Sequence, residues 1–202
     1  MVLKVLLATQ NQGKVKELRD LLKGEDIDVI SLLEIENWEE VEETGSTFAE
    51  NAKIKARAAA NLTGYISLAD DSGLEVDVLG GDPGVYSARF AGEPKDDEKN
   101  IDKLLSLLEN ISDAERKARF RCALAIITPE GEEFLTEGTV EGKILRQRRG
   151  SGGFGYDPIF SIAELGRTMA ELTLDQKNKL SHRAEAFRKA IPILQELARK
   201  SL

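Results

Sequence analysis

Two adjacent aspartates, Asp70 and Asp71, with Ser72 and Gly73 behind them, are the residues of this chain best suited to chemistry. They follow the apolar run at residues 65–69, which is typical of a short buried strand. We expect the pair to end that strand and the glycine to let the backbone turn sharply. A carboxylate at a strand end can hold a divalent cation or accept a proton from water. Asp-Ser-Gly is also ordinary turn sequence, so the pair taken alone favours a solvated turn.

A polar turn with the sequence TQNQGK occupies residues 9–14, between an apolar run at 2–8 and an amphipathic helical pattern. A strand, a glycine-containing turn and a helix in this order present helix N-terminal amides to an anion. Lys14 could meet phosphate oxygens there, while Thr9 and Asn11 donate hydrogen bonds. An ordinary Asx cap explains the same residues equally well. The chain has no Walker A sequence, so the turn is not a P-loop.

Two further polar groups can be explained as solvated surface. The acidic pair Glu42-Glu43 precedes a helix pattern, where carboxylates commonly face solvent or interact with the helix dipole. Asn51 and Lys55 lie four residues apart, so they project from one face of the helix expected at residues 47–62. A solvated helix face explains them as well as a site does.

A glycine-rich loop, GSGGFGYDP, spans residues 150–158. It matches the spacing G-x-G-x-x-G, but an arginine-rich stretch precedes it and Asp157-Pro158 follows where a helix should begin, which excludes a dinucleotide fold. Phe154 and Tyr156 could instead stack on a flat ligand that the glycines let approach closely. A polar cluster near the C-terminus adds further candidates: Lys177, Ser181, His182 and Arg183. No G-x-S-x-G sequence supports a Ser-His-Asp hydrolase.

Composition excludes several classes of protein. One cysteine and one histidine rule out an internal disulfide and make a zinc site of the usual ligands untenable, so any metal should be oxygen-bound, such as Mg²⁺. A net charge of −8 argues against binding to nucleic-acid backbones. No apolar stretch approaches the roughly 18 residues of a membrane span, and the N-terminus shows no cleavage site. We therefore expect a cytoplasmic protein with no membrane partner.

The order of elements predicts an α/β protein. Residues 2–8 read as a strand buried on both faces, and 27–33 as a weaker strand. Alternation at 74–78 predicts a half-buried strand, and residues 118–128 with 133–140 predict a hairpin. Strands compatible with parallel pairing thus mix with a hairpin, which indicates a mixed, strongly twisted sheet flanked by helices, in a single domain over residues 1–202.

Taken together, the motifs resemble one family, the inosine triphosphate pyrophosphatases, also called Ham1-like or non-canonical purine nucleoside triphosphate pyrophosphatases. The matching segments follow the family's order and cover nearly the whole chain: TQNQGK (9–14), EETGSTFAENAKIKA (42–56), ADDSGLEVDVLGGDPGVYSARFAG (69–92), GGFGYDPIF (152–160) and LSHRAEAF (180–187). The resemblance implies a two-lobed fold with a long central sheet and a homodimer. It also implies Mg²⁺-dependent cleavage of ITP, dITP or XTP to the monophosphate and pyrophosphate.

The resemblance also implies roles for individual residues. Asp71 would act as general base on the water that attacks the α-phosphorus, and Glu42 and Asp71 would hold Mg²⁺, with Glu43 or Asp70 nearby. Lys55 would help to neutralise the triphosphate, and Ser72 would contact the substrate. The triphosphate would lie on the turn formed by Thr9, Gln10, Asn11, Gln12, Gly13 and Lys14. The nucleobase would be bound by Phe154, Gly155, Tyr156, Asp157, Lys177, His182 and Arg183.

Base selection follows from hydrogen bonding. Hypoxanthine and xanthine present a 6-keto acceptor where adenine presents a donor, so a donor such as Arg183 or His182 would be left unpaired against ATP. Two alternatives stay open at this point: a pyrophosphatase for other modified nucleotides, such as methylated pyrimidines, and a nucleotide sensor that does not hydrolyse.

Overall fold

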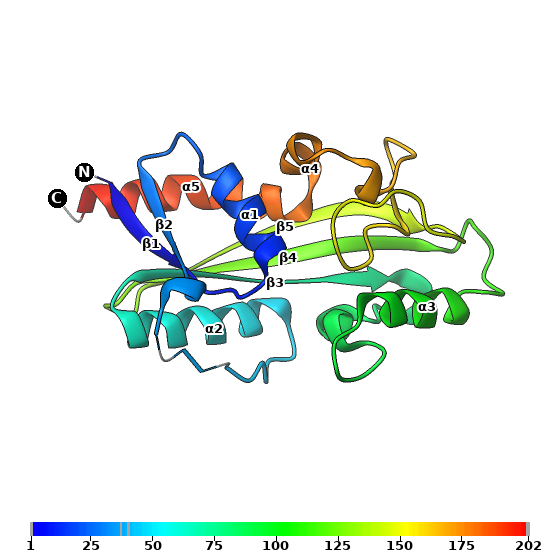
Figure 1. Cartoon of the computed structure of the whole chain (residues 1–202), viewed down its shortest axis with the longest axis horizontal. Coiled ribbons are helices and arrows are strands. Elements are labelled where there is room, and N and C mark those ends of the chain that lie inside the picture. The colour runs from blue at the N-terminus through cyan, green and yellow to red at the C-terminus, as the bar shows by residue number, and fades with distance from the viewer. Residues whose placement is uncertain (1, 37, 40, 201–202) are drawn as a thin grey trace. The chain divides into compact units, whose positions relative to one another are not determined.

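The computed structural model describes residues 2–36, 38–39 and 41–200 of the protein. Within them one mixed sheet has the strand order β2-β1-β3-β4-β5-β6 and is flanked by helices (Figure 1). β1 pairs in parallel with β2 and β3, and β5 pairs antiparallel with β6. The strands are β1 (Leu3–Leu7), β2 (Ile27–Ser31), β3 (Ile66–Val76), β4 (Lys117–Ile127), β5 (Glu133–Ile144) and β6 (Phe160–Ile162). The helices are α1 (Gln12–Leu21), α2 (Phe48–Thr63), α3 (Asp97–Leu107), α4 (Leu174–Leu180) and α5 (His182–Lys200). The predicted α/β fold with a mixed sheet is confirmed.

The chain divides into two compact units, each with its own hydrophobic core. The first unit comprises Met1–Asp71, Cys122–Gly138 and Arg183–Leu202, and the second comprises Ser72–Arg121 and Thr139–His182. A single domain over residues 1–202 stays a prediction. None of the helices in the described part of the chain combines the length and the apolar character that crossing a membrane requires.

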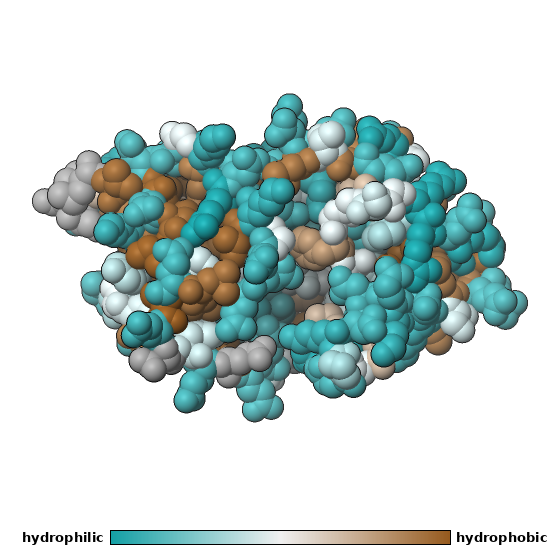
Figure 2. Space-filling view, in the orientation of Figure 1, coloured by the Kyte–Doolittle hydropathy of each residue, from teal (hydrophilic) through white to brown (hydrophobic). Residues whose placement is uncertain are grey.

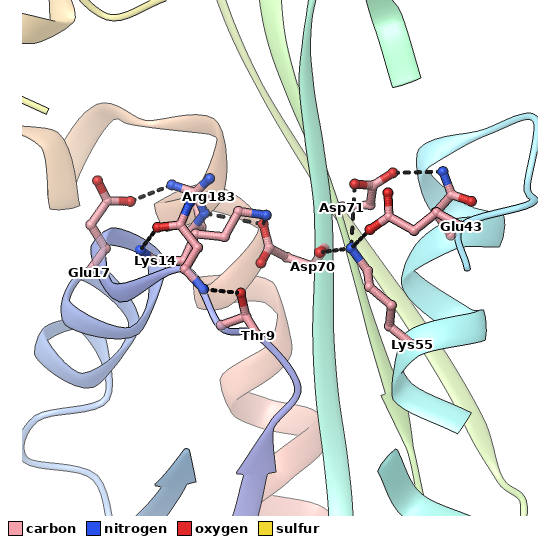
Figure 3. A network of polar contacts seen from close by, with 10 residues as sticks. Thr9, Lys14, Glu17, Glu43, Lys55, Asp70, Asp71 and Arg183 are labelled. Atoms are coloured by element: carbon pink, nitrogen blue, oxygen red, sulfur yellow. Dashed lines mark hydrogen bonds and ion pairs between the residues drawn. The ribbon is translucent and has the colours of Figure 1, made fainter. Parts of the chain in front are cut away.

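The core of the first unit lies between its strands and helices. Alternate residues of β1 and β3 pack with α1 and α5, as Leu7, Leu68 and Phe187 illustrate. α2 lies on the other side of β3 and buries an alanine face (Figures 1 and 3). Figure 2 shows hydrophobic residues reaching the surface over the β1–β2 side of this unit, where Ile27 and Val29 are only partly buried against the core.

Local sequence sets where the two site-bearing helices of the first unit begin. Asn11 is the N-cap of α1, and its side chain accepts a hydrogen bond from the Lys14 amide. α2 begins with a capping box, in which the side chains of Thr47 and Glu50 each accept a hydrogen bond from the other residue's amide. The helix ends at Gly64, whose φ of 68° lies in the left-handed region that glycine adopts without strain.

The second unit has a core formed by α3, β6 and parts of β3, β4 and β5. Its members include Leu74, Ile101 and Phe160. Arg116 is buried beside this core because its guanidinium donates to the carbonyls of Leu108, Ile144 and Leu145.

The prediction that Asp70-Asp71 ends a strand and that Gly73 begins a turn was wrong. β3 continues from Ile66 to Val76 through all four residues of that motif. Ion pairs and hydrogen bonds offset the cost of burying both carboxylates, so the chain has no need to turn toward water there. The weaker strand expected at 27–33 also ends earlier: β2 stops at Ser31, and residues 32–34 form a 3-10 turn.

Candidate active site

Asp70 and Asp71 point to opposite faces of β3, as consecutive strand residues must (Figure 3). Asp70 faces α1 and the start of α5, whereas Asp71 faces α2. Both side chains are buried, with 1% and 8% of the residue exposed. The two aspartates therefore organise two separate sets of charged groups within the first unit.

On the first face, Asp70 binds two cations. Its Oδ2 lies 2.8 Å from Lys14 Nζ and 3.3 Å from Arg183 Nε. The guanidinium of Arg183 also pairs with Glu17, which is buried on α1 one turn after Lys14. These four residues form a chain of alternating charge that ties the start of α1 to β3 and to the start of α5.

The charged forms of these four residues stabilise one another. Burial acts to raise the pKa of Asp70, but the attraction of Lys14 and Arg183 outweighs it and holds the pKa well below its usual range. Burial likewise acts to lower the pKa of Arg183, and Asp70 and Glu17 raise it instead. Asp70 is therefore an ionised partner of Lys14 and Arg183 at neutral pH.

On the second face, Asp71 contacts Asn51 and Lys55 of α2. Asn51 Nδ2 lies 3.1 Å from Asp71 Oδ2, and Lys55 Nζ lies 3.5 Å from Asp71 Oδ1. Lys55 also lies 2.8 Å from Glu43 Oε1 and donates to the Asp70 carbonyl. Glu43 therefore approaches Asp71 through Lys55, while its neighbour Glu42 is exposed.

Burial raises the pKa of Asp71, and although Lys55 and Lys14 act in the opposite direction, the net shift is upward. For Lys55, burial acts to lower the pKa, but Asp71 and Glu43 outweigh it and raise it. A carboxylate with a raised pKa beside a firmly protonated lysine is suited to accepting a proton from a reacting water.

The TQNQGK turn leads into the first turn of α1. Thr9 Oγ1 accepts from the Asn11 amide and Asn11 Oδ1 accepts from the Lys14 amide, so these two side chains cap the helix, as the Asx-cap alternative predicts. Gln10, Asn11 and Gln12 are exposed, while Lys14 is half-buried by its contact with Asp70. The first amides of a helix have no partner within it, so this exposed end can still receive an anion.

The carboxylates on the second face fit a magnesium ion. Oxygens of Glu43 and Asp71 approach the same ammonium, that of Lys55, so this position already attracts positive charge. Among residues 2–36, 38–39 and 41–200, no group of three or more His, Cys, Asp or Glu side chains has the arrangement of a metal site. Mg²⁺ is commonly held by only one or two carboxylates, together with substrate phosphates and water. Two converging carboxylates are thus a sufficient protein contribution.

In the second unit, the glycine-rich loop is built around Asp157. Asp157 Oδ2 accepts from the Phe154 amide at 3.1 Å and from Lys177 Nζ at 2.8 Å. Lys177 also lies over the Phe154 ring, 5.2 Å from its centroid. A Cβ at Gly153 would lie 1.9 Å from Asp157 Oδ2, so only glycine permits this close turn.

The other predicted base-binding residues are placed differently. Tyr156 is buried in the core of the second unit, where its hydroxyl donates to the Ser87 carbonyl. Gly155 donates its amide to Asp97. His182 is buried and stacks on Phe120, with ring centroids 5.0 Å apart. Ser72 is half-buried in β3, directly after Asp71.

Comparison with known proteins places the chain in a family. A model described as the Ham1 family matches residues 5–193. The chain belongs to the Ham1 family. This confirms the resemblance inferred from the motifs.

Full-length relatives and solved structures agree with that assignment. The chain is 57% identical to the dITP/XTP pyrophosphatase of Desulforamulus reducens, over 96% of this chain and 97% of that protein. It is 55% identical to the dITP/XTP pyrophosphatase of Bacillus subtilis, over 94% and 96%. The Ham1 protein of Staphylococcus aureus has the same fold, with a TM-score of 0.85 at 44% identity and coverage of 96% and 98%. A HAM1 protein from Coxiella burnetii gives a TM-score of 0.87 at 43% identity, over 96% and 99%.

The polar networks around Asp70 and Asp71 also contain residues that were not predicted as site residues from the sequence. Glu17 was not predicted as a site residue. The solvated-face interpretation of Asn51 was wrong, because Asn51 is fully buried. The one available signal for Asn51 was its four-residue spacing from Lys55 on a helix that follows an acidic pair. Nothing in the sequence distinguished Glu17.

Proposed function

We propose that this protein hydrolyses non-canonical purine nucleoside triphosphates, such as dITP, XTP and ITP, to the monophosphate and pyrophosphate. Such an enzyme removes deaminated nucleotides before they enter nucleic acid. The observation that carries the proposal is the buried Asp71–Lys55 pair on one face of β3, with the Lys14–Asp70 pair on the other, in a chain 57% identical over nearly its full length to a dITP/XTP pyrophosphatase.

In the proposed reaction, water attacks the α-phosphorus while Asp71 accepts its proton. The bond from that phosphorus to the oxygen bridging to the β-phosphate breaks, and pyrophosphate leaves with the bridging oxygen. The amides at the start of α1, with Thr9, Asn11 and Lys14, hold the phosphates. Lys55 stabilises the charge that develops in the transition state.

Charge balance is the reason to include Mg²⁺. In the contacts described above, Lys14, Lys55 and Arg183 already pair with the carboxylates of Glu17, Glu43, Asp70 and Asp71. A triphosphate would add further negative charge beside these carboxylates, which a divalent cation would offset. We propose that Asp71 and the Glu42–Glu43 pair hold Mg²⁺, which would supply electrostatic stabilisation of the phosphate oxygens.

Taken by itself, the second unit offers candidate contacts for a nucleobase: we propose Phe154 as the stacking face, with Lys177 and His182 offering polar contacts. The burial of Tyr156 supports leaving the stacking role to Phe154. Arg183 is engaged by Asp70 and Glu17, so a direct contact with the base would require it to give up one of these ion pairs.

The function is tested by initial rates on a panel of nucleotides with Mg²⁺, measuring pyrophosphate and orthophosphate separately. We expect pyrophosphate from dITP, XTP and ITP, and rates about 100-fold lower with ATP because the 6-amino group opposes a donor. EDTA should abolish turnover, and Mg²⁺ should restore it. Orthophosphate as the sole inorganic product would refute the proposal. Preference for methylated pyrimidines, or binding without turnover, would favour one of the two alternatives.

Asp157→Ala tests the base-binding role of the loop. The change removes the acceptor of the Phe154 amide and of Lys177, so we expect the KM for dITP to rise about tenfold while kcat changes much less. Asp175→Ala, at an exposed position on α4, is the matched control and should leave both constants unchanged. A fall in kcat with an unaltered KM would exclude a role confined to binding.

A further inference from the structure

A single buried amide, that of Asn51 near the start of α2, connects the loop that follows the acidic pair to Asp71 on β3. Its Oδ1 accepts a hydrogen bond from the Gly45 amide at 2.8 Å, and its Nδ2 donates to Asp71 Oδ2 at 3.1 Å. None of the Asn51 side chain is accessible to solvent. Both ends of the amide are therefore used inside the first unit.

Chemistry fixes which way this amide points. The Gly45 N–H can only donate, so it requires the carbonyl oxygen of Asn51. The Asp71 carboxylate can only accept, so it requires the amide nitrogen. The orientation is thus dictated at both ends, and no rotation of the amide by 180° would satisfy either partner.

The approach of the loop to Asn51 depends on glycine. A Cβ at position 45 would lie 2.6 Å from Asn51 Oδ1 and 2.6 Å from Glu50 Cβ. The neighbouring loop residues are also held, because Glu50 accepts the amides of Ser46 and Thr47. The backbone two residues after Glu43 is therefore fixed against α2.

The two oxygens of the Asp71 carboxylate have different partners. Its Oδ2 is bound by Asn51, whereas its Oδ1 faces Lys55, which also holds Glu43. One oxygen is thus fixed by a neutral donor, and the other faces the charged groups of the proposed reaction. Rotating the carboxylate would break the Asn51 contact.

We propose that Asn51 is a positioning residue: its amide fixes the plane of the Asp71 carboxylate and ties the Glu43-bearing loop to it through Gly45. This inference rests on the proposed function, in which Asp71 accepts the proton from water. Asn51 touches neither substrate nor water in this role and acts through Asp71.

Two substitutions separate positioning from a purely structural role. Asn51→Asp keeps the shape and the acceptor for Gly45 but loses the donor to Asp71. Asn51→Leu loses both contacts. Asn61→Asp, at an exposed position of the same helix, makes the same chemical change away from Asp71 and is the matched control.

We expect Asn51→Asp to lower kcat for dITP by about 10- to 100-fold, the range expected for losing a hydrogen bond to a charged group, with KM within about threefold of wild type. Asn51→Leu should lower kcat at least as much, and Asn61→Asp should leave both constants unchanged. In an Asp71→Asn background, Asn51→Asp should cause little further loss, because the group through which it acts is already absent.

Thermal stability gives a readout that does not depend on activity. Asn51→Asp places two carboxylates in contact and should lower the melting temperature. Combining it with Asp71→Asn reverses the pair, with the amide now donating from position 71, and should recover most of that loss. These melting temperatures measure the contact between residues 51 and 71 directly, so they do not depend on activity. If wild type releases no pyrophosphate from dITP, the proposed function is refuted, but the melting temperatures still test the contact.

Three results would overturn the inference. The first is an Asn51→Asp variant with kcat within threefold of wild type while Asn51→Leu is inactive, which would leave only the Gly45 contact important. The second is that Asn51→Asp lowers kcat in the Asp71→Asn background by the same factor as it does in wild type. The third is a reversed pair no more stable than Asn51→Asp alone. If Asn51→Leu fails to fold, Asn51→Asp still decides the question, since it preserves shape and the Gly45 bond.

Discussion

Asp71→Asn is expected to lower kcat for dITP by about a thousandfold, within the range for losing a general base. The amide cannot accept the proton of the attacking water. It also presents its NH₂ group toward Lys55 if its oxygen accepts from Asn51, so two donors would then face each other. Lys14, Thr9 and Asn11 remain in place, and we expect the Kd of a non-hydrolysable dITP analogue to change less than about tenfold, a loss mainly of transition-state stabilisation.

The matched control for this change is Asp28→Asn, an exposed position on β2. It makes the same substitution outside both polar networks and should retain wild-type kcat. The kinetic measurement uses saturating dITP and a series of Mg²⁺ concentrations, so that weaker metal binding is separated from the loss of the base. An Asp71→Asn variant that turns over within tenfold of wild type at saturating Mg²⁺ would exclude Asp71 as general base.

Local features of this chain were predictable from sequence. The Thr47–Glu50 capping box and the Asx cap at Asn11 depend on residues two to four positions apart, so the sequence contains all the information they need. Cys122 alternates with Phe120, Leu124 and Ile126 along the sequence, which indicates a core position, and Cys122 is buried.

The failure at Asp70-Asp71 has a different origin. Two charged residues are unfavourable inside a sheet unless cations are supplied, and one of those cations, Arg183, lies 113 residues away in the sequence. Arg183 is in turn held by Glu17, at a separation of 166 residues. No local pattern encodes such a pairing, so the sequence favoured a turn where the fold has a continuous strand.

The candidate site was likewise predictable only in part: the sequence suggested individual residues but not their long-range arrangement. Resemblance to a family nominated Lys14, Lys55 and Asp71, and the structure brings each of them into one of two networks around β3 (Figure 3). What sequence could not provide was the separation of the two aspartates onto opposite faces. That separation leaves Asp70 paired with Lys14 and Arg183, whereas Asp71 is the carboxylate that we propose as the general base.

Asp70→Asn is accordingly expected to act mainly on stability. Removing this charge leaves the cations Lys14 and Arg183 close together without the carboxylate that both contact, while Glu17 still pairs with Arg183. Breaking a buried ion pair from one side typically costs about 3–5 kcal/mol. For a protein of this size that corresponds to a fall of about 6–20 °C in melting temperature.

The pH dependence of this loss identifies its cause. The pKa of Asp70 is held far below its unfolded value of about 4. The unfolded chain therefore binds a proton at that carboxyl as pH falls below about 4, while the folded protein does not, so wild-type stability declines with acid. Asp70→Asn lacks this contribution at every pH. The gap in unfolding free energy between the two proteins should be full at pH 7 and narrow as pH falls below 4.

The sole tryptophan, Trp38, lies in the same compact unit as Asp70, so its fluorescence follows the unfolding of the relevant part of the chain. Denaturant titrations at pH 7 and pH 3 on wild type, Asp70→Asn and the exposed control Asp28→Asn give the required comparison. The control Asp28→Asn should have the unfolding free energy of wild type at both pH values. A gap between wild type and Asp70→Asn that does not narrow in acid would mean that Asp70 is not an ionised partner of Lys14 and Arg183. In that case the first network would stabilise the fold by packing alone, and the assignment of separate tasks to the two aspartates would have to be abandoned.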